Sequence, residues 1–124
     1  MKYLRPEQVL FIQARIISET GGSYGLRDIG LLQAALERPK STFDDNELYP
    51  GIFEKTAALI QSLVNNHPFI DGNKRTGVLA ALLFLRINDI EIKAKNDDLV
   101  RLLQDIVHGL TIPDIARWFE ARSD

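Results

Sequence analysis

The sequence of 124 residues contains no cysteine, so neither a disulfide framework nor a cysteine-ligated zinc site can form. It also lacks a long hydrophobic run, because its most apolar stretch, residues 78–85, is far shorter than the about 20 residues that a membrane-spanning helix needs. The first eleven residues carry charges at Lys2, Arg5 and Glu7 and no apolar core, unlike a signal peptide. We therefore expect a cytoplasmic protein that does not contact a membrane.

Neither sign of charge dominates. The 15 basic and 17 acidic residues leave a formal net charge of −2, so bulk electrostatics do not favour nucleic acid or an anionic surface. We expect no direct binding of nucleic acid, and any anion must be bound by a local site. The content of 45% hydrophobic and 26% charged residues is ordinary for a globular chain, and the length predicts a single domain over residues 1–124.

The spacing of apolar residues is helical almost throughout, which predicts an all-α fold. Capping residues, prolines and glycines predict helices from Pro6 to Gly21-Gly22, Asp28 to Pro39, Gly51 to Asn65, Gly72 to about Ile87, Asn96 or Asp97 to Gly109, and Thr111 to about Arg122. Residues 40–49 are polar and predict a loop, and the alternation in residues 90–93 predicts a short strand. The helix that begins at Gly72 is apolar on all sides, which predicts a central position.

Residues 67–76, HPFIDGNKRT, gather polar side chains at the start of this apolar helix. Gly72 permits a tight turn and a close approach of a ligand to the backbone. Asn73, Lys74 and Arg75 then fall in the first helical turn, where unpaired N–H groups and the positive end of the helix dipole attract anions. Cations are unfavourable there unless an anion is bound. These four residues are therefore the predicted phosphate-binding site.

Two further side chains of the motif add the chemistry of group transfer. Asp71 offers a hard oxygen ligand to a divalent metal that bridges phosphates. An imidazole can take a proton from a hydroxyl near neutral pH, so His67 is the predicted catalytic base. A lone histidine before proline, or a lone Lys-Arg pair, would more simply be loop or solvated surface. Within nine residues, however, base, metal ligand and phosphate site together indicate phosphoryl or nucleotidyl transfer.

The motif resembles the HxFx[DE]GNxxR-like signature of the Fic/Doc superfamily, and residues 25–39 are similar to the segment that follows the flap in its Doc (death-on-curing) members. The resemblance, with length and helix order, extends over essentially the whole chain. It implies a compact helical bundle around a central apolar helix, with ATP and Mg²⁺ as cofactors and a protein hydroxyl as acceptor. By position, His67 would be the base, Asp71 would bind Mg²⁺, and Asn73, Lys74 and Arg75 would contact phosphates. The flap that docks the target would be a loop or small hairpin made of Gly21, Gly22, Ser23, Tyr24, Gly25 and Leu26.

Two positions distinguish activities within the superfamily. AMP-transferring Fic members carry glycine where this chain has Lys74, and typically a second arginine where it has Val78. Both differences resemble Doc, which implies a toxin kinase that transfers the γ-phosphate of ATP to a threonine or serine of a translation factor, with elongation factor Tu expected. Two alternatives stay open: a Fic-type transferase of AMP, and a non-enzymatic module that binds nucleic acid or a partner, since residues 109–118 have the rhythm of a helix-turn-helix.

Self-inhibition can also be examined in the sequence. Many Fic proteins carry a helix with the pattern [ST]xxxE[GN], whose glutamate occupies the phosphate site. None of the glutamates in this chain has serine or threonine four residues before it. We therefore expect an inhibitor supplied in trans, a small antitoxin protein that folds against the domain near its active site.

Overall fold

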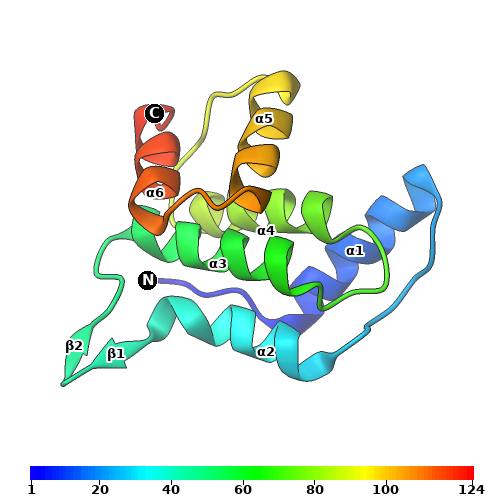
Figure 1. The fold of residues 1–124 in the computed structure, drawn as a ribbon, viewed down its shortest axis with the longest axis horizontal. Helices are drawn as coiled ribbons and strands as arrows, with labels where there is room; N and C mark the ends of the chain where they lie inside the picture. The colour runs from blue at the N-terminus through cyan, green and yellow to red at the C-terminus, as the bar shows by residue number, and fades with distance from the viewer.

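The computed structural model describes residues 1–124 and consists of helices and one small hairpin (Figure 1). The elements are α1 (Pro6–Thr20), α2 (Ile29–Glu37), η1 (Arg38–Lys40), β1 (Thr42–Phe43), β2 (Asn46–Glu47), α3 (Ile52–Asn66), α4 (Asn73–Ile87), α5 (Asn96–Val107) and α6 (Ile112–Ala121). The predicted all-α fold is therefore confirmed, and each of the six expected helices is present near its expected bounds. None of them combines the length and the apolar character that crossing a lipid bilayer demands.

The central helix of the bundle is α3 rather than α4. It packs against α2, η1, α4, α5 and α6, whereas α4 packs mainly against α1, α3 and α5. The two helices approach closely at Gly77, where an added Cβ would lie 2.8 Å from Cγ2 of Val64. On α4, Leu79 is 43% exposed, so the apolar residues of this helix are not confined to the face that packs in the core. The bundle therefore has a central helix, as predicted, but this helix is α3 and not the predicted α4.

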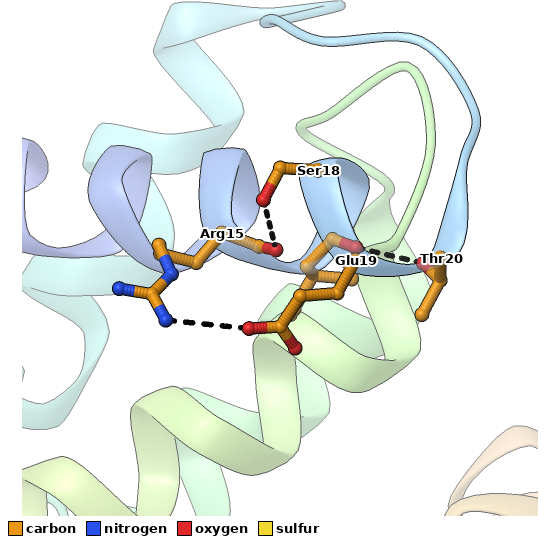
Figure 2. Close-up of polar contacts among 5 residues, drawn as sticks. Arg15, Ser18, Glu19 and Thr20 are labelled. Atoms are coloured by element: carbon orange, nitrogen blue, oxygen red, sulfur yellow. Dashed lines mark hydrogen bonds and ion pairs between the residues drawn. The ribbon is translucent and has the colours of Figure 1, made fainter.

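The last turn of α1 is closed by its own side chains (Figure 2). Thr20 Oγ1 donates a hydrogen bond to the carbonyl of Ile16 at 2.7 Å, and Ser18 Oγ donates to that of Arg15 at 2.9 Å. Gly21 follows with a φ of 83°, a backbone conformation that residues with a side chain rarely adopt. The chain therefore leaves the helix at the double glycine, as predicted, and the flap segment begins there.

Residues 40–49 differ from the prediction of a plain loop. Strands β1 and β2 pair antiparallel, and Asp44 and Asp45 between them have φ values of 53° and 63°. The acidic residues that suggested a loop are thus the turn of a hairpin, since aspartate tolerates positive φ. Buried Lys55 of α3 ties the hairpin to the bundle, because its Nζ donates to Glu47 Oε1 at 3.0 Å and also to the Tyr49 carbonyl.

Local predictions near the carboxyl end were partly wrong. Residues 90–93 form only an isolated bridge, in which Ile92 pairs with Ser123, rather than a strand. Helix α5 starts one residue early, so that Lys95 takes the cap position expected for Asn96 or Asp97. The cap of α6 is as predicted: Thr111 Oγ1 accepts a hydrogen bond from the Asp114 N–H at 3.3 Å.

Candidate active site

The motif residues converge on one open depression at the junction of α3 and α4. It has a volume of about 310 Å³ and is lined by His67, Ile70, Asp71, Gly72, Asn73, Lys74 and Arg75. Every residue to which the sequence analysis gave a catalytic, metal or phosphate role therefore lines the same depression. A larger cavity of about 620 Å³ lies between the start of α3 and α6 and contains none of these residues.

Two unpaired cations stand at the amino end of α4. Lys74 and Arg75 are exposed, and neither forms an ion pair or a side-chain hydrogen bond within the protein. Gly72 precedes them with a φ of 76° and leaves no side chain over the first turn. Free N–H groups, the positive dipole end and two cations thus face one opening, which makes the site suited to a multiply charged anion.

Asn73 stabilises the conformation of the loop between α3 and α4. Its Oδ1 accepts a hydrogen bond from the Phe69 N–H at 2.9 Å, and its Nδ2 donates to the Phe69 carbonyl at 3.0 Å. Phe69 is buried and anchors the loop in the core. Because both polar atoms of the Asn73 side chain are engaged, its backbone N–H is the group left for an anion. The phosphate contact that the resemblance implies for Asn73 stays a prediction, and this geometry assigns it to the backbone N–H.

His67 terminates α3 in a left-handed conformation, with φ of 52° and ψ of 60°. Few residues other than glycine adopt this conformation. It turns the chain out of the helix so that Pro68 and Phe69 return to the interior, where both are buried. The His67 side chain stays exposed and has no hydrogen-bond partner in the protein. It is therefore free to meet a hydroxyl that arrives from outside.

The flap, residues 21–26, is an extended loop that touches the metal-ligand candidate. The Asp71 carboxylate accepts a hydrogen bond from the Ser23 N–H at 2.8 Å through Oδ2. Gly22 lies close as well, since an added Cβ would be 3.3 Å from the same oxygen. Both segments are recognisable in the sequence, but no sequence pattern indicates the contact between them.

The flap continues along the loop as a short antiparallel pairing. The Ile70 N–H donates to the Gly25 carbonyl at 3.1 Å, and Leu26 and Phe69 form an isolated bridge. Figure 1 accordingly shows the segment between α1 and α2 running past the loop between α3 and α4. The inner edge of the flap is thus held against that loop by backbone hydrogen bonds.

Two residues that the sequence analysis missed hold this arrangement together. Gln13 of α1 is 2% exposed; its amide nitrogen donates to the carbonyls of Ser23 (3.3 Å) and Asp71 (3.2 Å), and its oxygen accepts from the Gly25 N–H (3.4 Å). Arg27 donates from its guanidinium to the carbonyl of His67. Gln13 could have been noticed in the sequence, because it places a polar amide within the apolar stripe of α1. Arg27 gave no signal, since it stands at a polar helix boundary.

The depression fits Mg²⁺ only together with a phosphate ligand. Asp71 is its one carboxylate, and Oδ1 has no partner in the protein. No group of three or more histidine, aspartate or glutamate side chains is placed to enclose a metal. Mg²⁺ in nucleotide sites is commonly held by one or two carboxylates, phosphate oxygens and water, which is the ligand set that Asp71 could complete.

Residues 3–85 match the sequence profile described as the Fic/DOC family. This chain belongs to the Fic/Doc family. The matched part contains α1, the flap, α2, α3 and nearly all of α4, so the whole candidate site of this Fic/Doc protein lies within it. The resemblance inferred from the motif is confirmed, although the family match ends before α5 and α6.

Curated relatives place this Fic/Doc protein with the Doc type. Over 94 residues it is 48% identical to "Toxin Doc" of Mycolicibacterium smegmatis (strain ATCC 700084 / mc(2)155), covering 76% of this chain and 71% of the relative. Over 92 residues it is 33% identical to "Protein kinase doc" of Escherichia phage P1, covering 74% and 72%. One relative is thus named for toxicity and the other for phosphate transfer.

Proposed function

We propose that this chain is a single Doc-type domain, residues 1–124, that acts in the cytoplasm as a toxin and as an ATP-dependent protein kinase. It would transfer the γ-phosphate of ATP to a threonine or serine hydroxyl of a translation factor, elongation factor Tu being the expected target, and so halt translation. The observation that carries the proposal is the single depression that joins His67, Asp71, Lys74 and Arg75. The name of the phage relative supports phosphate transfer.

The amino end of α4 would hold the triphosphate. The backbone N–H groups of the first turn and the side chains of Lys74 and Arg75 would bind its oxygens. Asp71 would bind Mg²⁺ through the oxygen that Ser23 leaves free. When bound there, Mg²⁺ would neutralise part of the phosphate charge.

His67 would act on the acceptor. Its imidazole would take the hydroxyl proton as the oxygen forms a bond to the γ-phosphorus. The bond between that phosphorus and the β–γ bridging oxygen breaks, ADP leaves, and the proton on His67 passes to solvent. Lys74 and Arg75 would offset the negative charge on the transferred group without any change in their own protonation.

The flap would align the target through its outer edge. Ser23 and Gly25 direct their hydrogen bonds inward, to Asp71, Gln13 and Ile70. Tyr24 between them is 58% exposed, and its backbone N–H and carbonyl have no partner in the protein. An extended segment of the target could therefore pair with this free edge.

Labelled ATP tests the proposed reaction. Incubation of the protein with cell lysate should move label from γ-labelled ATP, but not from α-labelled ATP, to a protein that gains about 80 Da. Transfer of the α label, with a gain of about 329 Da, would show the nucleotidyl alternative instead. If neither label moves while the protein binds MgATP, the proposed transferase activity is wrong.

An antitoxin supplied in trans has a suitable surface beside the depression. A groove of about 350 Å³ between α4 and α5 is lined by Arg75, Val78, Leu79, Asn96, Leu99, Val100 and Leu103. Arg75 also lines the depression, so a segment seated in the groove would lie against a phosphate-binding side chain. We propose that the antitoxin inhibits by covering this shared residue.

Leu79→Glu should uncouple the toxin from its antitoxin. An unpaired carboxylate in an apolar interface loses its hydration, so we expect the affinity for the antitoxin to fall at least about 100-fold, whereas toxicity is kept. Phe43→Glu is the matched control, because Phe43 is 76% exposed on the hairpin and outside the groove. The measurements are growth under co-expression and the dissociation constant of the pair. Full neutralisation of the Leu79 variant would place the antitoxin elsewhere.

A further inference from the structure

Arg27 holds the end of the helix that carries His67. Although it lies just before α2, its Nε donates to the His67 carbonyl at 2.7 Å and its Nη2 donates to the Asn66 carbonyl at 2.8 Å. Its backbone N–H donates to the Pro68 carbonyl at 2.8 Å. One residue, 40 positions away in sequence from His67, thus binds three consecutive carbonyls at the end of α3.

These carbonyls are well suited to a cation. The last carbonyls of a helix have no partner within it and form the negative end of its dipole. The planar fork of a guanidinium can satisfy two of them at once through charge-assisted hydrogen bonds. His67 also has a φ of 52°, a backbone conformation that a non-glycine residue adopts only where its surroundings impose it.

We propose that Arg27 is a positioning residue for catalysis, which sets the direction of the His67 imidazole by clamping the peptide units on both sides of it. The proposal rests on the proposed role of His67 as the base. The Asp28 N–H also donates to the Pro68 carbonyl, at 3.0 Å. The remaining contacts of the loop run from Asn73 to Phe69 and from the flap and Gln13 to Ile70 and Asp71, beyond the residue that bears the imidazole. Arg27 alone contacts the carbonyl of His67 through a side chain.

The clamp contributes more to geometry than to global stability. Arg27, Asn66 and His67 are all exposed, so solvent can replace the lost hydrogen bonds. The capping of α2 depends instead on Asp28, whose Oδ1 accepts from the Leu31 N–H at 3.1 Å. A displacement of about 1 Å in a catalytic group can nevertheless slow a reaction on the order of 100-fold. Loss of the clamp should therefore appear in the rate.

The test compares Arg27→Met, Arg27→Lys and a control, Arg15→Met. Methionine keeps much of the apolar stem without its donors, and lysine keeps the charge without the fork. Arg15 is an exposed arginine on α1 whose partner is Glu19 at 3.3 Å (Figure 2). In Arg27→Met we expect kcat to fall about 10- to 100-fold, with the KM for ATP and the calorimetric Kd for MgATP unchanged within about two-fold. Arg27→Lys should recover part of the rate, and Arg15→Met should match the wild type.

A second readout does not depend on activity. The chain has two histidines, His67 and His108, so the ring signals of His67 can be assigned by comparison with His108→Ala in an NMR spectrum. We expect the His67 ring signals to shift or broaden in Arg27→Met and to stay unchanged in Arg15→Met.

The outcomes separate this inference from the proposed function. If the wild type transfers label and Arg27→Met keeps its full kcat, the positioning role is wrong while the kinase stands. A loss confined to the affinity for MgATP would also overturn it. If the wild type transfers nothing, the proposed function fails, and the NMR comparison still decides: unchanged His67 signals in Arg27→Met reject the clamp.

Discussion

His67→Ala is expected to lower the rate of phosphate transfer about 100- to 10,000-fold, the range that loss of a general base produces. The binding of MgATP should stay within about two-fold of the wild type, because the predicted phosphate contacts come from α4 and the predicted Mg²⁺ ligand is Asp71, rather than the imidazole. The rate is measured with γ-labelled ATP and the affinity by calorimetry. Expression of the variant in cells should no longer arrest growth.

Backbone strain at position 67 requires a second variant. Alanine must adopt the same φ of 52°, a conformation that asparagine tolerates better. His67→Asn should therefore lose the rate to a similar degree while keeping the thermal stability of the wild type. His108→Ala is the matched control, since His108 caps α5 outside the depression. Full toxicity in either His67 variant would refute the proposed mechanism.

The sequence located the candidate site because its residues are contiguous. A loop of six residues between two helices cannot separate His67 from Arg75 widely, so the depression was predictable once the helices were. The helix start at Asn73 was predictable too, because Gly72 and the change to an apolar run mark it. Local spacing determines such features, and they needed no knowledge of the tertiary fold.

The contacts that hold the site were beyond the reach of sequence. Gln13 meets the Asp71 carbonyl across 58 positions, and Arg27 meets the His67 carbonyl across 40. Such partners depend on how α1 and α2 pack around α3, which periodicity does not specify. Asn73 shows that even short-range contacts can escape prediction from sequence. Its position in the first turn suggested an anion contact, but its side chain forms hydrogen bonds with the backbone of Phe69.

The choice between α3 and α4 as the central helix failed for a related reason. Both segments are rich in apolar residues, and the sequence of α4 is the more uniform. Leu79, which is 43% exposed, lies outside the core and lines the groove beside α5. An apolar residue needed for a partner has the same appearance in sequence as one needed for folding.

Arg75→Ala should have the second largest effect, and it should act on binding as well as on rate. Arg75 has no partner within the protein, so its removal leaves no buried group unpaired and should not disturb the fold. If the guanidinium binds phosphate oxygens, we expect the Kd for MgATP to rise about 10-fold or more and kcat to fall about 100-fold. Calorimetry and the labelled-ATP assay measure the two effects separately.

The controls distinguish a specific contact from a change in net charge. Arg101→Ala removes an equal charge from an exposed position on α5 that lines neither the depression nor the groove, and it should leave both quantities unchanged. Arg75→Lys should retain most of the affinity, which depends on charge, and less of the rate, which depends on the guanidinium geometry. If Arg75→Ala binds MgATP as tightly as the wild type, the triphosphate does not lie at the amino end of α4. In that case Lys74 and Arg75 bind another anion, and the proposal that the depression binds ATP is wrong.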